Sequence, residues 1–275
     1  MRAYFLFIAF GVALTCGTAF GQTPVAKGTA NKSLIDDLVL ANRILASKEL
    51  SFLDPFGHVS VRDPAEPGHY YMARWVSAGM VTADDIIEYD LDSNPVDPSR
   101  KDNFNERFIH GEIYKARSDV MAVVHSHTPE LVTFSISSIP LRPVFNGGVF
   151  IGDGIPIFDI RKFNNGNTGI VSNPGLGREL AKELGVKPAI LMYAHGAVTV
   201  DSSLINLVTR ADYLRQNAQI QMAAIQLGGT VDYVQVPARD PAARTGPRPA
   251  NPQANTGANG SYRAWEYWKR LIQVQ

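Results

Sequence analysis

The sequence predicts an α/β protein, in which strands and helices follow one another along most of the chain. Short apolar runs rich in Val and Ile, typical of strands, recur between longer segments whose apolar residues are spaced three or four apart, typical of helices. The chain has 275 residues, of which 45% are hydrophobic, and this is enough for one domain with a substantial core. Neither a strand-linked Gly-x-Gly-x-x-Gly motif nor a P-loop occurs, so nucleotide binding has no motif support.

The individual elements follow from local patterns. The first helix is expected over 33–49, where Ser33 can cap the N-terminus and Leu34, Leu38 and Leu45 share one face. Strands are expected over 57–62, 70–73, 86–89, 120–127, 155–160 and 189–194, with 197–200 continuing the last of them. Further helices are expected over 105–117, 129–136, 176–184 and 203–227.

The two ends of the chain are expected to lie outside the main domain, which we place at 22–236. Residues 1–21 resemble a secretory signal peptide, with Arg2, an apolar run and small residues before the cleavage point. This segment predicts a periplasmic or secreted protein with no stable membrane insertion, because the apolar run is shorter than the roughly 20 residues of a spanning helix. Residues 237–260, rich in Pro, Ala, Asn and Gly, are expected to form a linker, and 261–275 an aromatic C-terminal helix or lid.

Composition narrows the range of partners. The chain carries 26 basic and 26 acidic residues, a formal net charge of zero, and no basic stripe, which argues against nucleic acid as a partner. The only cysteine, Cys16, lies in the expected signal peptide. Any metal in the mature protein must therefore be held by His, Asp or Glu.

Three histidines predict a metal centre. His125 and His127 close an apolar run, and residues two apart in a strand point to the same side. His195 follows a second apolar run, so two strand ends each deliver histidine. Three neutral imidazoles with one open position suit catalytic zinc and several other divalent metals.

Glu106 is the candidate acid–base residue, because it lies near the start of the helix that precedes the His-bearing strand. The alternative is a first-turn carboxylate that complements the helix dipole.

The ordered pieces Asn105-Glu106-Arg107-Phe108-Ile109-His110, Ala122-Val123-Val124-His125-Ser126-His127 and Ala194-His195-Gly196 together resemble the class II aldolase/adducin-like family, over roughly residues 33–230. The resemblance implies a three-layer α/β/α fold around a mainly antiparallel central sheet. It also implies one divalent metal per subunit on His125, His127, His195 and Glu106, with zinc preferred and Mn²⁺ or Fe²⁺ as alternatives. Family members are usually homotetramers, and a C-terminal segment often closes a neighbour's site.

One loop separates this chain from the sugar-phosphate aldolases of the family. It reads Gly57-His58-Val59-Ser60 in place of the family's Gly-Asn-(Leu/Ile)-Ser, and resembles a branch of aromatic and heteroaromatic dicarboxylate decarboxylases. We therefore expect His58, Ser60 and Arg74 to bind the substrate, since Arg is the natural bidentate partner of a carboxylate. A surface salt bridge is the alternative for Arg74, and a structural role the alternative for Ser60.

These observations predict a metal-dependent carbon–carbon lyase acting on a small hydroxy, oxo or aromatic carboxylate through a metal-stabilised enolate. Decarboxylation and retro-aldol cleavage stay open. A non-haem iron oxygenase is a further alternative, since two histidines and Glu106 could form a facial triad. A non-catalytic adducin-like scaffold is another, although the retained metal-binding residues argue against it.

Overall fold

The structure is a computed structural model that describes residues 27–228, 230–234 and 256–273. The expected signal peptide, 1–21, and most of the expected linker, 237–260, lie outside the described residues. None of the helices within the described residues is both long and apolar enough to cross a membrane.

A seven-stranded sheet forms the centre of the molecule, in the order β3-β2-β1-β4-β7-β6-β5. All neighbouring strands are antiparallel except β5 and β6, which are parallel. The strands are β1 (His58–Arg62), β2 (His69–Ala73), β3 (Ile86–Asp90), β4 (Ala122–Ser126), β5 (Ile157–Phe158), β6 (Ala189–Met192) and β7 (Gly196–Asp201).

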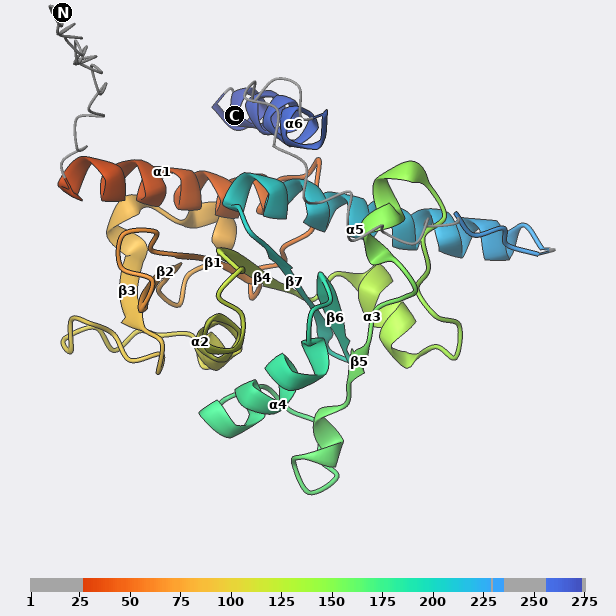
Figure 1. Cartoon of the computed structure of the whole chain (residues 1–275), viewed down its shortest axis with the longest axis horizontal. Coiled ribbons are helices and arrows are strands. Elements are labelled where there is room, and N and C mark those ends of the chain that lie inside the picture. The colour runs from red at the N-terminus through yellow and green to blue at the C-terminus, as the bar shows by residue number, and fades with distance from the viewer. Residues whose placement is uncertain (1–26, 229, 235–255, 274–275) are drawn as a thin grey trace, which may run out of the picture.

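Helices cover both faces of this sheet, so the expected three-layer α/β/α architecture is confirmed (Figure 1). The α-helices are α1 (Lys27–Ala46), α2 (Arg107–Ala116), α3 (Pro129–Ile136), α4 (Pro174–Leu184), α5 (Leu204–Gln226) and α6 (Thr256–Gln273). One hydrophobic cluster joins the sheet to α1, α3 and α5, and a second joins its opposite face to α2 and α4. Every residue of the central strands β1 and β4 is buried, as expected for strands covered on both faces.

The side chains of β4 point alternately to the two faces of the sheet, and this determines the face on which the histidines lie. Val124 belongs to the α1/α5 cluster and Val123 to the α2/α4 cluster. Because alternate side chains of a strand share a face, His125 points to the α2/α4 side with Val123. His58 is its direct partner across β1 and β4, so both imidazoles lie on this side.

Two expected strands differ in the structure. The segment 189–200 is not one strand continued past His195 but an antiparallel hairpin of β6 and β7, because Ala194 in the turn takes a positive φ of 52°. Gly196 at the start of β7 is required by a close approach: a Cβ atom there would lie 2.0 Å from the carbonyl oxygen of Ser126. The strand expected over 155–160 shortens to β5, because a 3₁₀ turn begins at Ile160.

The C-terminal helix expected over 261–275 is present as α6 and packs against α5 and α1 (Figure 1). Trp265 and Trp268 are buried there in the α1/α5 cluster, whereas Tyr262 and Tyr267 are exposed. Within its own chain α6 therefore contributes to the core, and closure over a neighbour's site stays a proposal.

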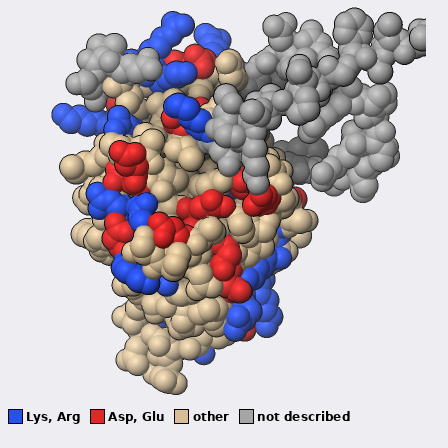
Figure 2. All heavy atoms as spheres, turned by 90° about the vertical axis from the view of Figure 1, so that its left-hand side faces the viewer, with Lys and Arg blue, Asp and Glu red and all other residues tan. Residues whose placement is uncertain are grey.

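On the face shown in Figure 2, acidic and basic side chains are interspersed, without a patch of a single sign.

Candidate metal centre

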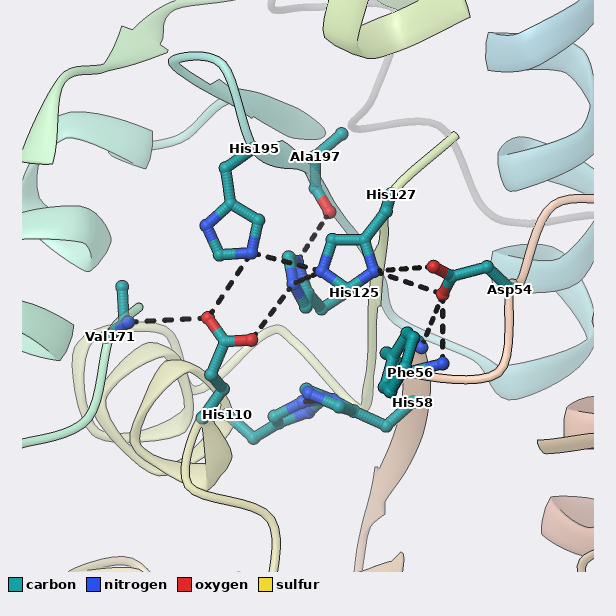
Figure 3. A network of polar contacts seen from close by, with 11 residues as sticks. Asp54, Phe56, His58, His110, His125, His127, Val171, His195 and Ala197 are labelled. Carbon is teal, nitrogen blue, oxygen red and sulfur yellow. Dashed lines mark hydrogen bonds and ion pairs between the residues drawn. The ribbon is translucent and has the colours of Figure 1, made fainter. Parts of the chain in front are cut away.

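The four side chains expected to hold a metal lie together on the α2/α4 side of the sheet (Figure 3). His125 is in β4 and His127 just beyond its end. His195 is in the turn of the β6–β7 hairpin, which β4 contacts through β7. Glu106 precedes the first residue of α2 and reaches the histidines from the helix layer.

The donor atoms form a compact set. The Nε2 atom of His127 lies 3.1 Å from the Nε2 atoms of both His125 and His195. The Glu106 oxygens lie 3.5 Å from His125 Nε2 and 3.7 Å from His195 Nε2. Ligands about 2.1 Å from a tetrahedral ion are about 3.4 Å apart, so these spacings are those of a zinc-type site.

The outer hydrogen bonds of the histidines turn their lone pairs inward. His125 Nδ1 lies 3.1 Å from the carbonyl oxygen of Ala197, which can only accept, so Nδ1 carries the proton. His127 Nδ1 in the same way donates to the Asp54 carboxylate, at 3.0 and 3.1 Å. Both Nε2 atoms are thus bare acceptors facing each other at 3.1 Å, an unfavourable arrangement that a bound cation would make favourable. The donor set therefore fits a divalent metal.

The protonation states agree with this fit. Burial alone would raise the pKa of the Glu106 carboxyl, but His125 and His195 when they are protonated, together with the backbone N–H of Val171, lower this pKa to about 2. Burial and the neighbouring His125 lower the pKa of His195 to about 4. At neutral pH the site thus presents a carboxylate and a neutral imidazole, the forms that bind metals.

A small cavity opens onto these donors. Its volume is about 190 Å³, below the 300–1,000 Å³ typical of sites for drug-sized ligands. It is lined by the donor residues Glu106, His127 and His195 and by Phe56, Trp75, Phe104, Asn105 and Ile170.

The expected substrate-binding residues lie elsewhere. Ser60 is fully buried, 2.6 Å from His110 Nδ1 and 2.7 Å from the Tyr114 hydroxyl, because the strand alternation turns it towards α2. Arg74 pairs with Asp85 at 2.7 Å, the surface salt bridge that was its alternative. Neither residue lines the cavity, so the expected substrate contacts have no support from this geometry.

His58 is buried behind Phe104, which lines the cavity, and does not line the cavity itself. Its ring lies 4.6 Å from that of Phe104 and 5.2 Å from that of His125. Its Nδ1 is 2.8 Å from His110 Nε2, and its Nε2 has no hydrogen-bond partner within the described part of the chain. Burial, then the neighbouring histidines, keep the pKa of His58 well below its usual value, so the imidazole is neutral.

Asp54 contacts the candidate site and was not among the residues expected from the sequence. Besides His127, its Oδ1 accepts hydrogen bonds from the backbone N–H groups of Phe56, at 3.1 Å, and Gly57, at 2.8 Å. The local signal was Asp54-Pro55-Phe56-Gly57, which is typical of an Asx turn and indicates nothing about a histidine 73 residues away.

Comparison with known proteins agrees with this geometry. Residues 36–222 match the family described as Class II Aldolase and Adducin N-terminal domain. The chain belongs to this family. Its fold is similar to that of an aldolase II superfamily protein from Pseudomonas syringae, with a TM-score of 0.67 and 23% identity over 91% of this chain and 95% of that one.

Several curated relatives carry the names of enzymes. The chain is 34% identical to Decarboxylase tropJ of Talaromyces stipitatus over 64% of this chain and 71% of the relative. It is 28% identical to 3,4-dihydroxyphthalate decarboxylase of Rhodococcus jostii over 45% of this chain and 50% of the relative. It is 33% identical to 4-hydroxy-3-prenylphenylpyruvate oxygenase/4-hydroxy-3-prenylbenzoate synthase of Streptomyces roseochromogenus subsp. oscitans, over 63% of this chain and 61% of the relative. The chain thus resembles the decarboxylase branch of the family, while spanning only part of each relative's length.

Proposed function

We propose that this protein is a divalent-metal-dependent carbon–carbon lyase that removes CO₂ from a small carboxylate substrate. The observation that carries the proposal is the Glu106 carboxylate beside three inward-facing imidazole nitrogens, at the floor of a small cavity. The decarboxylase relatives favour loss of CO₂ over retro-aldol cleavage, which would use the same residues.

His125, His127 and His195 would hold the ion together with Glu106. Zinc fits the donor spacings, and Mn²⁺ and Fe²⁺ accept the same imidazole and carboxylate ligands. A divalent metal bound there supplies Lewis-acid stabilisation of the negative charge that develops on a substrate oxygen when the carbon–carbon bond breaks.

Glu106 would move the proton. As a carboxylate at neutral pH it can take the proton of a substrate hydroxyl. When CO₂ leaves, the electron pair of the broken bond remains on the substrate carbon, and Glu106 returns the proton there. The Val171 N–H, which donates to Glu106 Oε1 at 3.3 Å, holds the carboxylate in place during this exchange.

An oxygenase is the second candidate, favoured by the name of the Streptomyces relative. Sites for non-haem iron and O₂ keep three positions open beside two histidines and one carboxylate. The third histidine near Glu106 leaves fewer open positions, and for this reason we favour the lyase.

The test is elemental analysis of the purified full chain and of its His127→Ala variant. We expect about one divalent metal per chain, lost in the variant. His69→Ala is measured alongside, because His69, Glu66 and Glu88 form a second group of possible metal ligands. Loss of the metal in His127→Ala but not in His69→Ala assigns the ion to the three-histidine site. Absence of metal from the wild type after reconstitution would refute the proposal.

The identity of the metal then directs the assay. Zinc or manganese calls for measurement of CO₂ release from hydroxylated aromatic acids and for a retro-aldol assay. Iron with substrate-dependent O₂ consumption would replace the lyase by the oxygenase.

Assembly and location are also proposals. We propose that the protein is a homotetramer, which light scattering coupled to size-exclusion chromatography would test. We also propose that residues 1–21 direct its export, which N-terminal sequencing of the secreted protein would test by finding a start at Gln22.

A further inference from the structure

Three large apolar side chains at the mouth of the cavity are exposed. Phe56 is 58% exposed, Trp75 53% and Ile170 42%, and they come from three separate connections between the elements of the fold. Leaving apolar area in water forfeits about 25 cal/mol per Å², so the fold gains little from these positions. Apolar groups that converge on one cavity from distant parts of a chain are typical of a binding site. We call these three side chains the apolar wall.

The apolar wall is held in place from behind. The Trp75 ring lies 5.0 Å from that of Phe104, which is buried, at an interplanar angle of 48°. Phe56 is held through its backbone N–H by Asp54, the same carboxylate that binds His127. The Trp75 ring and the Phe56 backbone therefore have defined positions beside the metal-binding residues.

The charge of the cavity restricts what can bind. Among the described residues, no Lys or Arg lines the cavity, and apart from the metal-binding residues and the indole N–H of Trp75 its only polar side chain is that of Asn105. Arg74, next to Trp75 in sequence, pairs with Asp85 and Asp102, at 2.7 and 3.6 Å. A phosphate monoester would be expected to require cationic side chains or several backbone N–H groups, whereas oxygens on one edge of a flat ring can be bound by the metal alone.

We infer that Trp75 is the principal residue by which this cavity distinguishes a planar aromatic hydroxy acid, the substrate class that the names of the decarboxylase relatives already suggest, from saturated and phosphorylated acids. This inference rests on the proposed lyase function and adds to it the residue that selects the substrate. The ring stacks against Trp75 while its carboxylate and hydroxyl oxygens face the metal-binding residues. Saturated rings and phosphorylated sugars are poor ligands.

The test compares three ligands by isothermal titration calorimetry on the full chain, with and without added Zn²⁺. The first is 2-hydroxybenzoate. The second is 2-hydroxycyclohexane-1-carboxylate, which carries the same oxygens on a ring that is not flat. The third is phosphoglycolate, a small carboxylate with a phosphate group. Each is titrated into the wild type, Trp75→Phe, Trp75→Leu and the control Tyr213→Leu, which changes a partly exposed aromatic residue on α5, on the face of the sheet opposite to the α2/α4 side.

We expect the zinc-loaded wild type to bind 2-hydroxybenzoate about three to ten times more tightly than the saturated acid, the range that an aromatic contact provides. Trp75→Leu should remove this preference, whereas Trp75→Phe and Tyr213→Leu should keep it. Equal binding of the two rings, an unchanged preference in Trp75→Leu, or tightest binding of phosphoglycolate would overturn the inference.

Metal content measured on the same samples separates the two proposals. A chain that binds zinc but shows no ring preference keeps the lyase proposal and loses this one. A chain that binds no zinc refutes the lyase. The aromatic preference is then sought in the metal-free titrations, and its absence there refutes the inference as well.

Discussion

Asp54→Asn is the most informative single substitution at this site, because it removes one negative charge and little else. Oδ1 of Asp54 accepts from the Phe56 and Gly57 backbones and from His127, whereas Oδ2 contacts only His127. An asparagine keeps Oδ1 and hence the turn. What it loses is the negative charge beside the His127 ring, and its NH₂ group at the Oδ2 position faces the Nδ1–H of His127. Both changes disfavour the tautomer whose Nε2 is free to bind a metal.

The size of the effect follows from that contact. A hydrogen bond to a charged group contributes about 1.5–3 kcal/mol, and substitution of the outer partner of a metal-binding histidine typically costs 10- to 100-fold in metal affinity. The two ranges agree, since tenfold corresponds to about 1.4 kcal/mol. We therefore expect Asp54→Asn to weaken zinc binding by about 10- to 100-fold while the protein stays folded.

The assay is competition for Zn²⁺ against a chromophoric chelator, with thermal unfolding of the metal-free protein measured alongside. Asp97→Asn is the matched control, because the Oδ1 atom of Asp97 also accepts from the backbone two residues on, at 2.9 Å from Ser99, without a histidine. Zinc affinity within about twofold of the wild type in Asp54→Asn would refute the argument that this carboxylate orients His127.

Four further results are expected. Glu106→Gln should retain metal on the three imidazoles but reduce turnover about 10²- to 10⁴-fold, and a near-normal rate would make Glu106 a helix-start carboxylate only. Gly196→Ala should lower the melting temperature and the zinc content together, because the new Cβ would meet the Ser126 carbonyl at 2.0 Å. Burial holds the pKa of His110 at about 3, so between there and about pH 6.5 the unfolded chain binds one more proton. His110 alone should then lower the stability of the metal-free protein by up to about 1.4 kcal/mol per pH unit as the pH drops, in addition to the contributions of His58 and His195, and His110→Gln should reduce the slope seen in denaturant titrations. Trp265→Ala should cost about 3–5 kcal/mol in the same titrations, whereas an unchanged midpoint would show that α6 is not part of the core.

The sequence alone was sufficient to predict those parts of the fold and of the site that depend on neighbouring residues in the chain. The two-residue repeat of a strand puts His125 and His127 on one side, and the helix start accounts for the position of Glu106. The helices over 105–117, 176–184 and 203–227 were located to within two residues at each end, because their apolar spacing is regular.

The features of the fold and the site that the sequence did not predict depend on contacts between distant segments of the chain, or on backbone angles with no local sequence signal. The positive φ of Ala194 folds the chain back at His195, and an alanine gives no local sign of such a turn. The bond of Asp54 to His127 joins residues 73 apart. Ser60 and Arg74 have side chains suited to a substrate, but the first faces α2 and the second pairs with Asp85. An exposed Trp75 cannot be distinguished from a buried one by sequence alone.

The apolar wall and the four donors are built on different parts of the fold. The donors are held by the register of β4 and β7, by the hairpin turn and by the start of α2, whereas Phe56, Trp75 and Ile170 lie on connections. Connections tolerate substitution and insertion better than the elements they join. We therefore expect substrate range and metal binding to be separable by mutagenesis. A library confined to positions 56, 75 and 170, which leaves Asp54 unchanged, should alter the ring preference while the zinc content of the variants stays that of the wild type.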